Sequence, residues 1–174
     1  MQPYPPIATE RLTLRPTQVE DADFICALLN SPGWLTHIGD RGVRTIEDAE
    51  QYIRNRMLPQ LEQRGYSNNT IVRNADGVRV GVCGVYVREG LDHADIGYAL
   101  LPEHTQQGYA LEASTALMET AKSQYGIKQL DAITTEANTA SQNLLRKLGF
   151  TFVKFTRLPD DPEELMLFTK ILHD

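Results

Sequence analysis

The chain has 174 residues, with 17 Lys and Arg against 23 Asp and Glu, and a formal net charge of −6. Its hydrophobic fraction of 41% and charged fraction of 23% exclude wholesale disorder, and its length fits one domain spanning residues 1–174. An acidic balance argues against nonspecific nucleic-acid binding, and two cysteines exclude a disulfide scaffold or a four-thiolate zinc site. Because the sequence shows neither a secretory signal nor an apolar run of ~20 residues, we expect a cytoplasmic protein without a membrane partner.

The first predicted elements are a strand and a helix. Apolar and polar residues alternate over 12–15, which predicts a half-buried strand that Pro16 ends. Thr17 and Glu20 have the spacing of a capping box, in which each side chain accepts a hydrogen bond from the backbone of the other. The sequence therefore predicts a helix from this point to about Leu29.

A second helix start follows in the same form. Thr45 and Asp48 repeat the capping-box spacing, and apolar residues then recur at helical intervals as far as Leu61. Pro59 lies within this pattern. Since proline lacks a backbone N–H and clashes with the preceding turn, we expect it to kink or shorten the helix.

The second half of the chain predicts most of a sheet. A helix is expected over 109–125, closed by Gly126, and a shorter one from Asn138, ending at Gly149. Strands are expected over 70–73, 78–87, 94–101, 128–135, 150–157 and 165–172. Because the middle strands form a meander and the later ones alternate with helices, the pattern predicts a mixed-sheet α/β or α+β domain.

The segment from 100 to 113 is the first candidate functional motif. A strand ends there, a polar turn follows, and a helix opens at Gly108. The first amides of a helix lack internal partners and favour anions, and a glycine lets a phosphate approach the backbone. The chain has neither a Walker sequence nor a Gly-x-Gly-x-x-Gly fingerprint, which disfavours nucleoside triphosphates and dinucleotides. Taken alone, such a glycine more often marks a plain tight turn.

The segment from Asn138 to Phe150 is a second motif, and the first motif is more specific when the two are considered together. Together with Thr9–Arg15 and Ile96–Ala113, in that order, the second motif resembles the GNAT N-acetyltransferases, specifically the ribosomal-protein N-terminal acetyltransferase (Rim-type) branch. The likeness spans nearly the whole chain. It implies a single GNAT-type α+β domain, with a mixed, mostly antiparallel sheet of six or seven strands flanked by helices on both faces.

The resemblance also implies acetyl-CoA as a co-substrate and no metal. In this family the strands matching 94–101 and 130–136 separate, which leaves backbone groups near Tyr98 free to bond the pantetheine amides. The amides after them would hold the diphosphate, and Leu144 or Leu145 would lie against apolar parts of the pantetheine. The cofactor-binding residues implied in this way are Leu100, Leu101, Gln106, Gln107, Gly108, Tyr109, Ala110, Asn138, Ser141 and Leu145.

Two positions of the loop depart from the family pattern. The family often has Arg or Gln where this chain has Thr105, and a small residue where it has Gln106. Since backbone amides do most of the binding, this departure affects the expected side-chain contacts more than cofactor use.

The catalytic candidates follow from the chemistry of acetylating an amine. A protonated amine has no lone pair, so a carboxylate, or a water leading to one, must take its proton. Asp95 and Glu136 are the candidates for this base. For each of them the alternative is an exposed carboxylate on a strand with no catalytic role. A backbone amide near Leu100 could hold the oxyanion. Many members of the family have a proton-donating tyrosine where this chain has Leu145. Here Ser141 or a water relay would instead protonate the departing coenzyme A thiolate. Ser141 could equally be a first-turn serine bonded to the backbone.

The expected acceptor is a protein N-terminus or a small amine, bound by a monomer or a homodimer. Trp34 and the segment Gly33–Gly42 lie where relatives commonly shape the acceptor pocket, although packing of the tryptophan explains it equally. The missing tyrosine at Leu145 leaves a noncatalytic acyl-CoA-binding or sensor domain as an alternative, and a protein-interaction domain without cofactor as a third.

Overall fold

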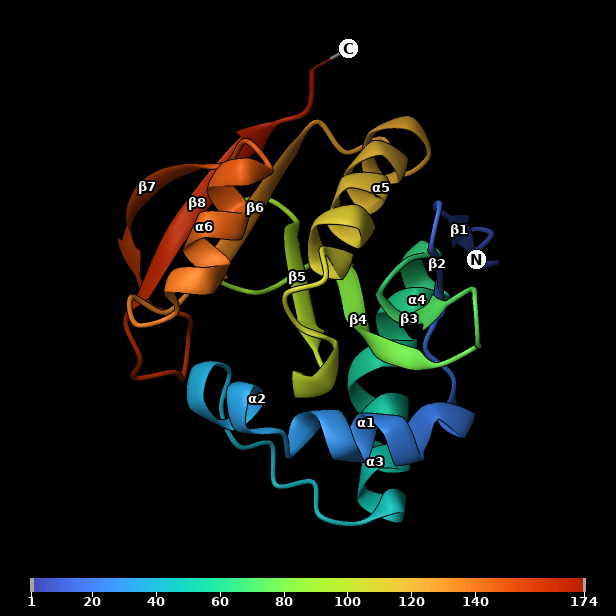
Figure 1. Ribbon diagram of the computed structural model, residues 1–174. Helices are drawn as coiled ribbons and strands as arrows, with labels where there is room; N and C mark the ends of the chain where they lie inside the picture. Colours follow the sequence, from blue (N-terminus) through green and yellow to red (C-terminus); the bar gives the residue numbers. More distant parts are fainter. Residues whose placement is uncertain (1, 174) are drawn as a thin grey trace.

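The architecture centres on one sheet of eight strands in the order β1-β2-β3-β4-β5-β6-β8-β7, shown in the computed structural model, which describes residues 2–173 (Figure 1). Neighbouring strands are antiparallel except β5 and β6. The strands are β1 (Ile7–Ala8), β2 (Leu12–Pro16), β3 (Asn68–Arg73), β4 (Arg79–Tyr86), β5 (Asp95–Leu100), β6 (Gln129–Thr134), β7 (Thr151–Thr156) and β8 (Leu165–Ile171). The predicted mixed, mostly antiparallel sheet is confirmed, with one strand more than expected, because the two-residue β1 is too short to show alternation.

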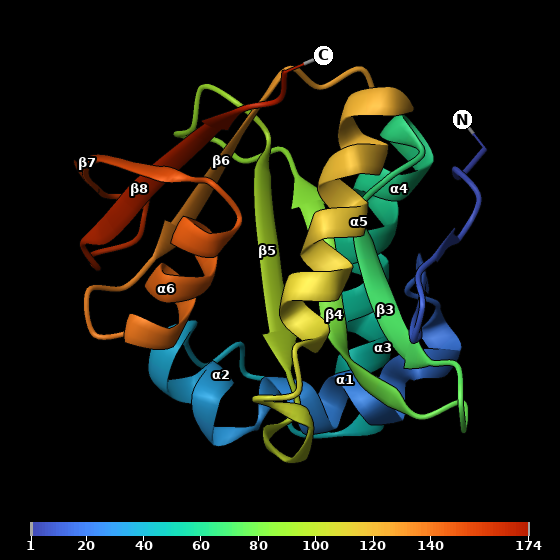
Figure 2. The ribbon, with the colours of Figure 1, turned by 45° about the horizontal axis from the view of Figure 1, so that its top comes forward.

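Helices cover both faces of this sheet, as predicted. In Figures 1 and 2, α5 and α6 lie on one face and α1, α3 and α4 on the other. The α-helices are α1 (Ala22–Leu29), α2 (Pro32–His37), α3 (Ile46–Tyr52), α4 (Leu58–Arg64), α5 (Tyr109–Ser123) and α6 (Thr139–Lys147). Shorter turns are the 3₁₀ segments Val19–Asp21 and Pro102–His104 and the π-helical turn Ile53–Met57.

The hydrophobic core has two parts, one on each face. On the α5 side, Leu117 packs in a cluster with Val85 of β4 and other fully buried residues. On the other face, Ile25 of α1 and Ile53 pack with Val82, also from β4. Burying each such side chain contributes about 1.5–3 kcal/mol, so β4, apolar on both faces, is the strand that joins the two halves.

The predicted start of the first helix is wrong by one residue. Gln18 N donates to Asp21 Oδ2 at 2.9 Å, so these two residues, rather than Thr17 and Glu20, form the cap. Thr17 is buried and its hydroxyl lies 2.9 Å from that of Thr70. The Asp21 carboxylate also accepts two hydrogen bonds of 2.8 Å from Arg15, so this ion pair determines which residue caps the first helix.

The second helix start is confirmed and the effect of Pro59 is resolved. Asp48 N donates to Thr45 Oγ1 and Thr45 N to Asp48 Oδ2, both at 3.1 Å. The chain stays helical from Ile46 to Arg64, but a π-helical turn precedes Pro59, which lies in the first turn of α4 where a missing N–H is tolerated. Helix α2, which begins at Pro32 and is separated from α1 by two residues, was not predicted, because the sequence indicated only that the first helix ends at about Leu29.

Candidate acyl-transfer site

The site is built where the two parallel strands separate. The register of β5 and β6 contains one residue pair, Asp95 with Asp131, next to a hydrogen bond of 2.9 Å from Asp131 N to Ala94 O. Figure 2 shows the strands close together at this end and apart at the other, where α2 and the start of α6 lie. The predicted separation of these strands is therefore confirmed.

Backbone groups of β5 line the widening gap. Leu101 N donates to Val80 O of β4 at 3.0 Å, whereas Ala94 O accepts from β6. In a strand, the N–H and C=O of one residue point to the same side, and the side alternates from each residue to the next. Since Ala94 faces β6 and Leu101 faces β4, the backbone groups of Tyr98 and Leu100 point to the β6 side, into the gap. Leu101, predicted as a cofactor ligand, has its backbone committed elsewhere, since its carbonyl also accepts from His104 N at 3.0 Å.

The loop before α5 has an unusual backbone. Gly108, the residue before the helix, has φ +81°, and Gln106 has φ +60°. The left-handed region costs a residue with a Cβ about 1–2 kcal/mol, so glycine, which has no Cβ, would suit position 106 better than glutamine. The first backbone bond of α5 runs from Glu112 N to Gly108 O at 3.0 Å, so the amides of Tyr109 and Ala110 precede it and have no acceptor within the helix.

A hydroxyl of β5, from Tyr98, and a hydroxyl of α6, from Ser141, meet where the start of α6 faces β5. Asn138 Oδ1 accepts from Ser141 N at 3.1 Å, which confirms the predicted helix cap. Tyr98 Oη lies 3.1 Å from Ser141 Oγ and donates to Ser141 O at 3.2 Å. Burial raises the pKa of Tyr98 to about 12, so its hydroxyl keeps its proton at neutral pH. The role of Tyr98 as a hydroxyl partner was missed, because nothing in the strand pattern indicates where its ring ends.

The two leucines predicted beside the pantetheine differ in exposure. Leu145 is only 1% exposed and belongs to the core on the α5 side, whereas Leu144 is partly exposed and packs at the edge of that core. Of the pair, Leu144 is the one that presents surface to a ligand in this conformation.

The two candidate carboxylates lie at opposite ends of the gap. Asp95 is 1% exposed and receives bonds of 2.9 and 3.0 Å from Arg88 Nε. Burial, together with the nearby charge of Asp131, raises the pKa of Asp95 to about 6 in spite of the guanidinium of Arg88. Glu136 follows β6 at the wide end and is exposed. The structure does not bring them together, so they are alternatives rather than a pair.

Unpaired polar atoms gather near the wide end. Within residues 2–173, the buried side-chain atoms without a hydrogen-bond partner are Trp34 Nε1, His37 Nδ1 and Thr135 Oγ1. Trp34 and His37 are three residues apart on α2, which both ribbon views place beside the start of α6, and Thr135 directly follows β6 (Figures 1 and 2). Buried polar groups are normally hydrogen-bonded, so these three unpaired atoms are exceptions within the described residues.

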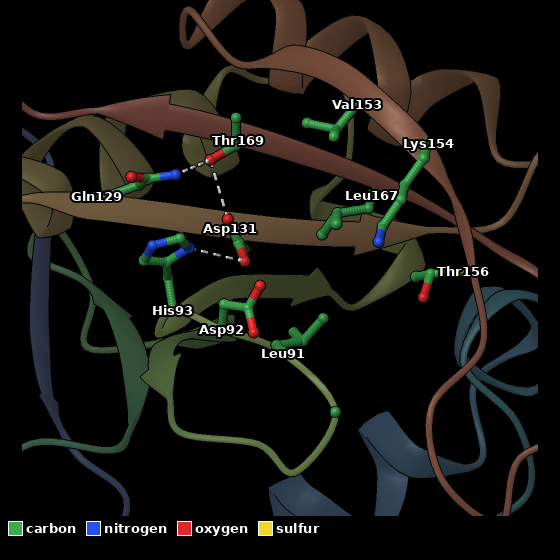
Figure 3. A pocket seen from close by; sticks show the side chains of 11 residues that line it. Leu91, Asp92, His93, Gln129, Asp131, Val153, Lys154, Thr156, Leu167 and Thr169 are labelled. Carbon is green, nitrogen blue, oxygen red and sulfur yellow. Dashed lines mark hydrogen bonds and ion pairs between the residues drawn. The ribbon is translucent and has the colours of Figure 1, made fainter.

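A separate hollow of about 230 Å³ lies on the face of β6, β8 and β7 that is turned away from α6. Figure 3 shows Asp131 at its base, with Thr169 Oγ1 donating to Asp131 Oδ1 at 2.9 Å and His93 Nδ1 3.5 Å from Oδ2. None of the predicted site residues lines this hollow, which is bounded by the segment 90–93 instead. The hollow is therefore separate from the predicted cofactor-binding residues.

Two further findings concern metals and membranes. No group of three or more His, Cys, Asp or Glu side chains within residues 2–173 is arranged to hold a metal ion. In the same part of the chain, no helix combines the length and apolar character needed to cross a bilayer.

Comparison with known proteins identifies the family. A model of the acetyltransferase (GNAT) domain matches residues 11–151. The uncharacterized N-acetyltransferase p20 of Bacillus licheniformis is 31% identical over 145 residues, covering 82% of this chain and 80% of that protein. An acetyltransferase structure from Agrobacterium tumefaciens superposes with a TM-score of 0.81 at 23% identity, covering 97% of this chain and 95% of the other.

A structure with bound coenzyme A shares the same fold. RimL, a ribosomal L7/L12 alpha-N-protein acetyltransferase in complex with coenzyme A, superposes with a TM-score of 0.74 at 21% identity, covering 97% and 98% of the two chains. Because the family model spans most of the sequence and the separated strands and helix start are in place, this chain belongs to the GNAT family and is an acetyl-CoA-dependent acetyltransferase.

Proposed function

We propose that the enzyme transfers an acetyl group directly from acetyl-CoA to a primary amine, either a protein N-terminus or a small amine. The observation that carries this proposal is the continuity of the gap: backbone groups of Tyr98 and Leu100 face it, and the strand then leads into the amides that open α5. An elongated ligand with an amide-containing arm and an anionic end matches that sequence of groups.

The predicted cofactor-binding residues would have three roles: bonding the pantetheine amides, bordering the pantetheine arm and holding the diphosphate. Gap-facing groups of Tyr98 and Leu100 would bond the pantetheine amides, and Asn138, Ser141 and Leu144 would border the same arm from α6. The diphosphate would be held by backbone amides. These belong to Gln106, Gln107, Gly108, Tyr109 and Ala110.

The chain also supplies the groups for proton movement. The thioester supplies the acetyl group; nitrogen attack forms the N–C bond, and the C–S bond then breaks. A backbone amide at Leu100 would stabilise negative charge developing on the carbonyl oxygen. The amine's proton goes to Asp95 or Glu136, directly or through water, and Ser141 or a water gives a proton to the departing thiolate.

The acceptor class is the finer part of the proposal. RimL, which has this fold, carries in its name a protein N-terminus as the acceptor. If the acceptor end opens on binding, the unpaired N–H of Trp34 and hydroxyl of Thr135, both buried in the free protein, would donate to a carbonyl oxygen next to the amine, which a peptide offers and a simple alkylamine lacks.

An amine panel tests the proposal. The protein is incubated with acetyl-CoA and peptides with free N-termini, the same peptides with blocked N-termini and an internal lysine, or small amines. Release of free CoA thiol, with an acetyl group added to the amine by mass spectrometry, is expected. Neither turnover nor coenzyme A binding at near-millimolar concentration would refute it, and saturable binding without transfer to any amine would support the sensor alternative instead.

A further inference from the structure

Arg11 reaches the cofactor loop from the far N-terminal part of the chain. It precedes β2, yet its Nη1 donates to Gln107 O at 3.0 Å, across 96 residues of sequence. Its guanidinium carbon also lies 4.6 Å from the centre of the Tyr109 ring. The arginine therefore contacts both the loop and the first residue of α5.

The position of Arg11 is fixed by Glu112 in the first turn of α5. Glu112 Oε2 accepts from Arg11 Nε at 2.8 Å, and Oε1 accepts from Arg11 N at 3.0 Å and from Thr9 Oγ1 at 3.1 Å. The carboxylate thus holds the arginine by its backbone and its side chain at once. Charge-assisted bonds are roughly twice as strong as neutral ones, and the rigid planar fork of the guanidinium directs separate N–H groups at the Glu112 carboxylate and the Gln107 carbonyl.

The bond to Gln107 O has a consequence for the next amide. A peptide unit is planar and trans, so its C=O and N–H point in opposite directions. Because Arg11 holds the Gln107 carbonyl on its own side, the N–H of Gly108 points away from Arg11. Gly108 is exposed and has φ +81°, and a Cβ at this position would lie 3.3 Å from Arg11 Nη2, so the arginine occupies one side of the glycine.

We propose that Arg11 is a positioning residue for the cofactor: it sets the peptide plane between Gln107 and Gly108 so that the Gly108 amide faces the diphosphate. It acts through the loop rather than by touching the ligand. This inference rests on the proposed binding of the diphosphate at the start of α5. It accounts for the contact between the N-terminal segment and α5, which the cofactor motif alone does not require.

The test compares full and truncated cofactors. Arg11→Gln keeps a polar side chain but loses the fork and the charge. Binding of coenzyme A, measured by calorimetry, should weaken about tenfold. Turnover of S-acetylpantetheine, which lacks the diphosphate, should stay within about twofold of wild type. Arg11→Lys should fall between the two proteins, because an ammonium group is a point charge without the planar fork.

Arg73→Gln is the matched control. Arg73 Nη1 also contacts the first residue of α5, 3.4 Å from Tyr109 Oη, but no bond joins it to the loop carbonyl. This variant should bind coenzyme A like wild type. The inference is overturned if Arg11→Gln binds coenzyme A within twofold of wild type, or if it loses S-acetylpantetheine turnover to the same extent. Failure of the wild-type protein itself to bind coenzyme A would instead refute the proposed function.

Discussion

Tyr98 Oη and Ser141 Oγ lie 3.1 Å apart, joining β5 to the first turn of α6 across the separated strands. The tyrosine hydroxyl also donates to the backbone carbonyl of the same serine. Leu145, at the position on α6 where the family resemblance implies a tyrosine, is buried in the core. Two hydroxyl groups are nevertheless present on the gap, one from each wall.

Ser141→Ala tests the proposed proton donor. If Ser141 protonates the departing thiolate, kcat should fall about 100-fold with little change in the KM for acetyl-CoA. Tyr98→Phe should reduce kcat less, because it removes a hydroxyl that orients Ser141. Thr139→Ala, on the exposed first residue of α6, is the control and should be neutral. An unchanged kcat in Ser141→Ala would leave the serine with only a backbone role.

The pH dependence of kcat/KM distinguishes the two carboxylates. Only an ionised carboxylate can accept a proton, so if Asp95 is the base, activity should be low in acid and rise through a midpoint near pH 6. Asp95→Asn should remove that rise, whereas Glu136→Gln should keep it. The reverse pattern would assign the base to Glu136.

Asp131→Asn tests the assignment of Asp95 as the base while leaving the Asp95 side chain in place. The negative charge of Asp131 raises the pKa of Asp95, against the lowering effect of Arg88. Removing that charge should move the rise in kcat/KM to lower pH. A midpoint that stays in place would mean that the titrating group lies elsewhere.

Gln106→Gly tests whether the loop binds through its backbone. The substitution relieves a positive φ, so the free energy of unfolding should stay level or rise by up to about 1 kcal/mol in chemical denaturation. The Kd for coenzyme A should change less than threefold. Gln107→Gly, at a position without a positive φ, should instead lose about 0.5–1 kcal/mol of stability. A tenfold weaker Kd in Gln106→Gly would show that the glutamine side chain takes part.

Trp34→Phe tests the acceptor end. It removes an unpaired buried N–H but also part of a half-buried ring, so these opposing effects should leave the free energy of unfolding within about 1 kcal/mol of wild type. If the indole N–H bonds the acceptor, the KM for the amine should rise severalfold and the KM for acetyl-CoA should not. Equal KM values for both substrates in the variant and wild type would exclude Trp34 from acceptor binding.

Local signals in the sequence predicted most of the fold. The Thr45–Asp48 cap is made entirely by neighbouring residues, and its spacing located it correctly. The cap at Asp21 was misplaced because Arg15 and Arg79, the latter 58 residues away, both bond the Asp21 carboxylate. Spacing within a few residues cannot reveal such a partner.

At the site, too, features made by neighbouring residues were predicted and contacts between distant residues were not. The start of α5 was located because its turn, glycine and helix are contiguous in sequence. Tyr98 and Arg11 were missed as side-chain contributors, since their contacts with Ser141 and Gln107 cross 43 and 96 residues. Leu101 was assigned one residue beyond the gap-facing groups, and only the pairing with β4 shows which side of the strand its amide takes.

The most direct measurement is the affinity of two variants of Gly108 for coenzyme A by calorimetry. Asn and Asp both tolerate the left-handed backbone and have similar size, so Gly108→Asn and Gly108→Asp share any strain and differ in charge. If the amides around this residue hold a diphosphate, the aspartate variant should bind at least tenfold more weakly than the asparagine variant while both remain folded. Equal affinity in the two proteins would place the anionic end of the coenzyme somewhere else.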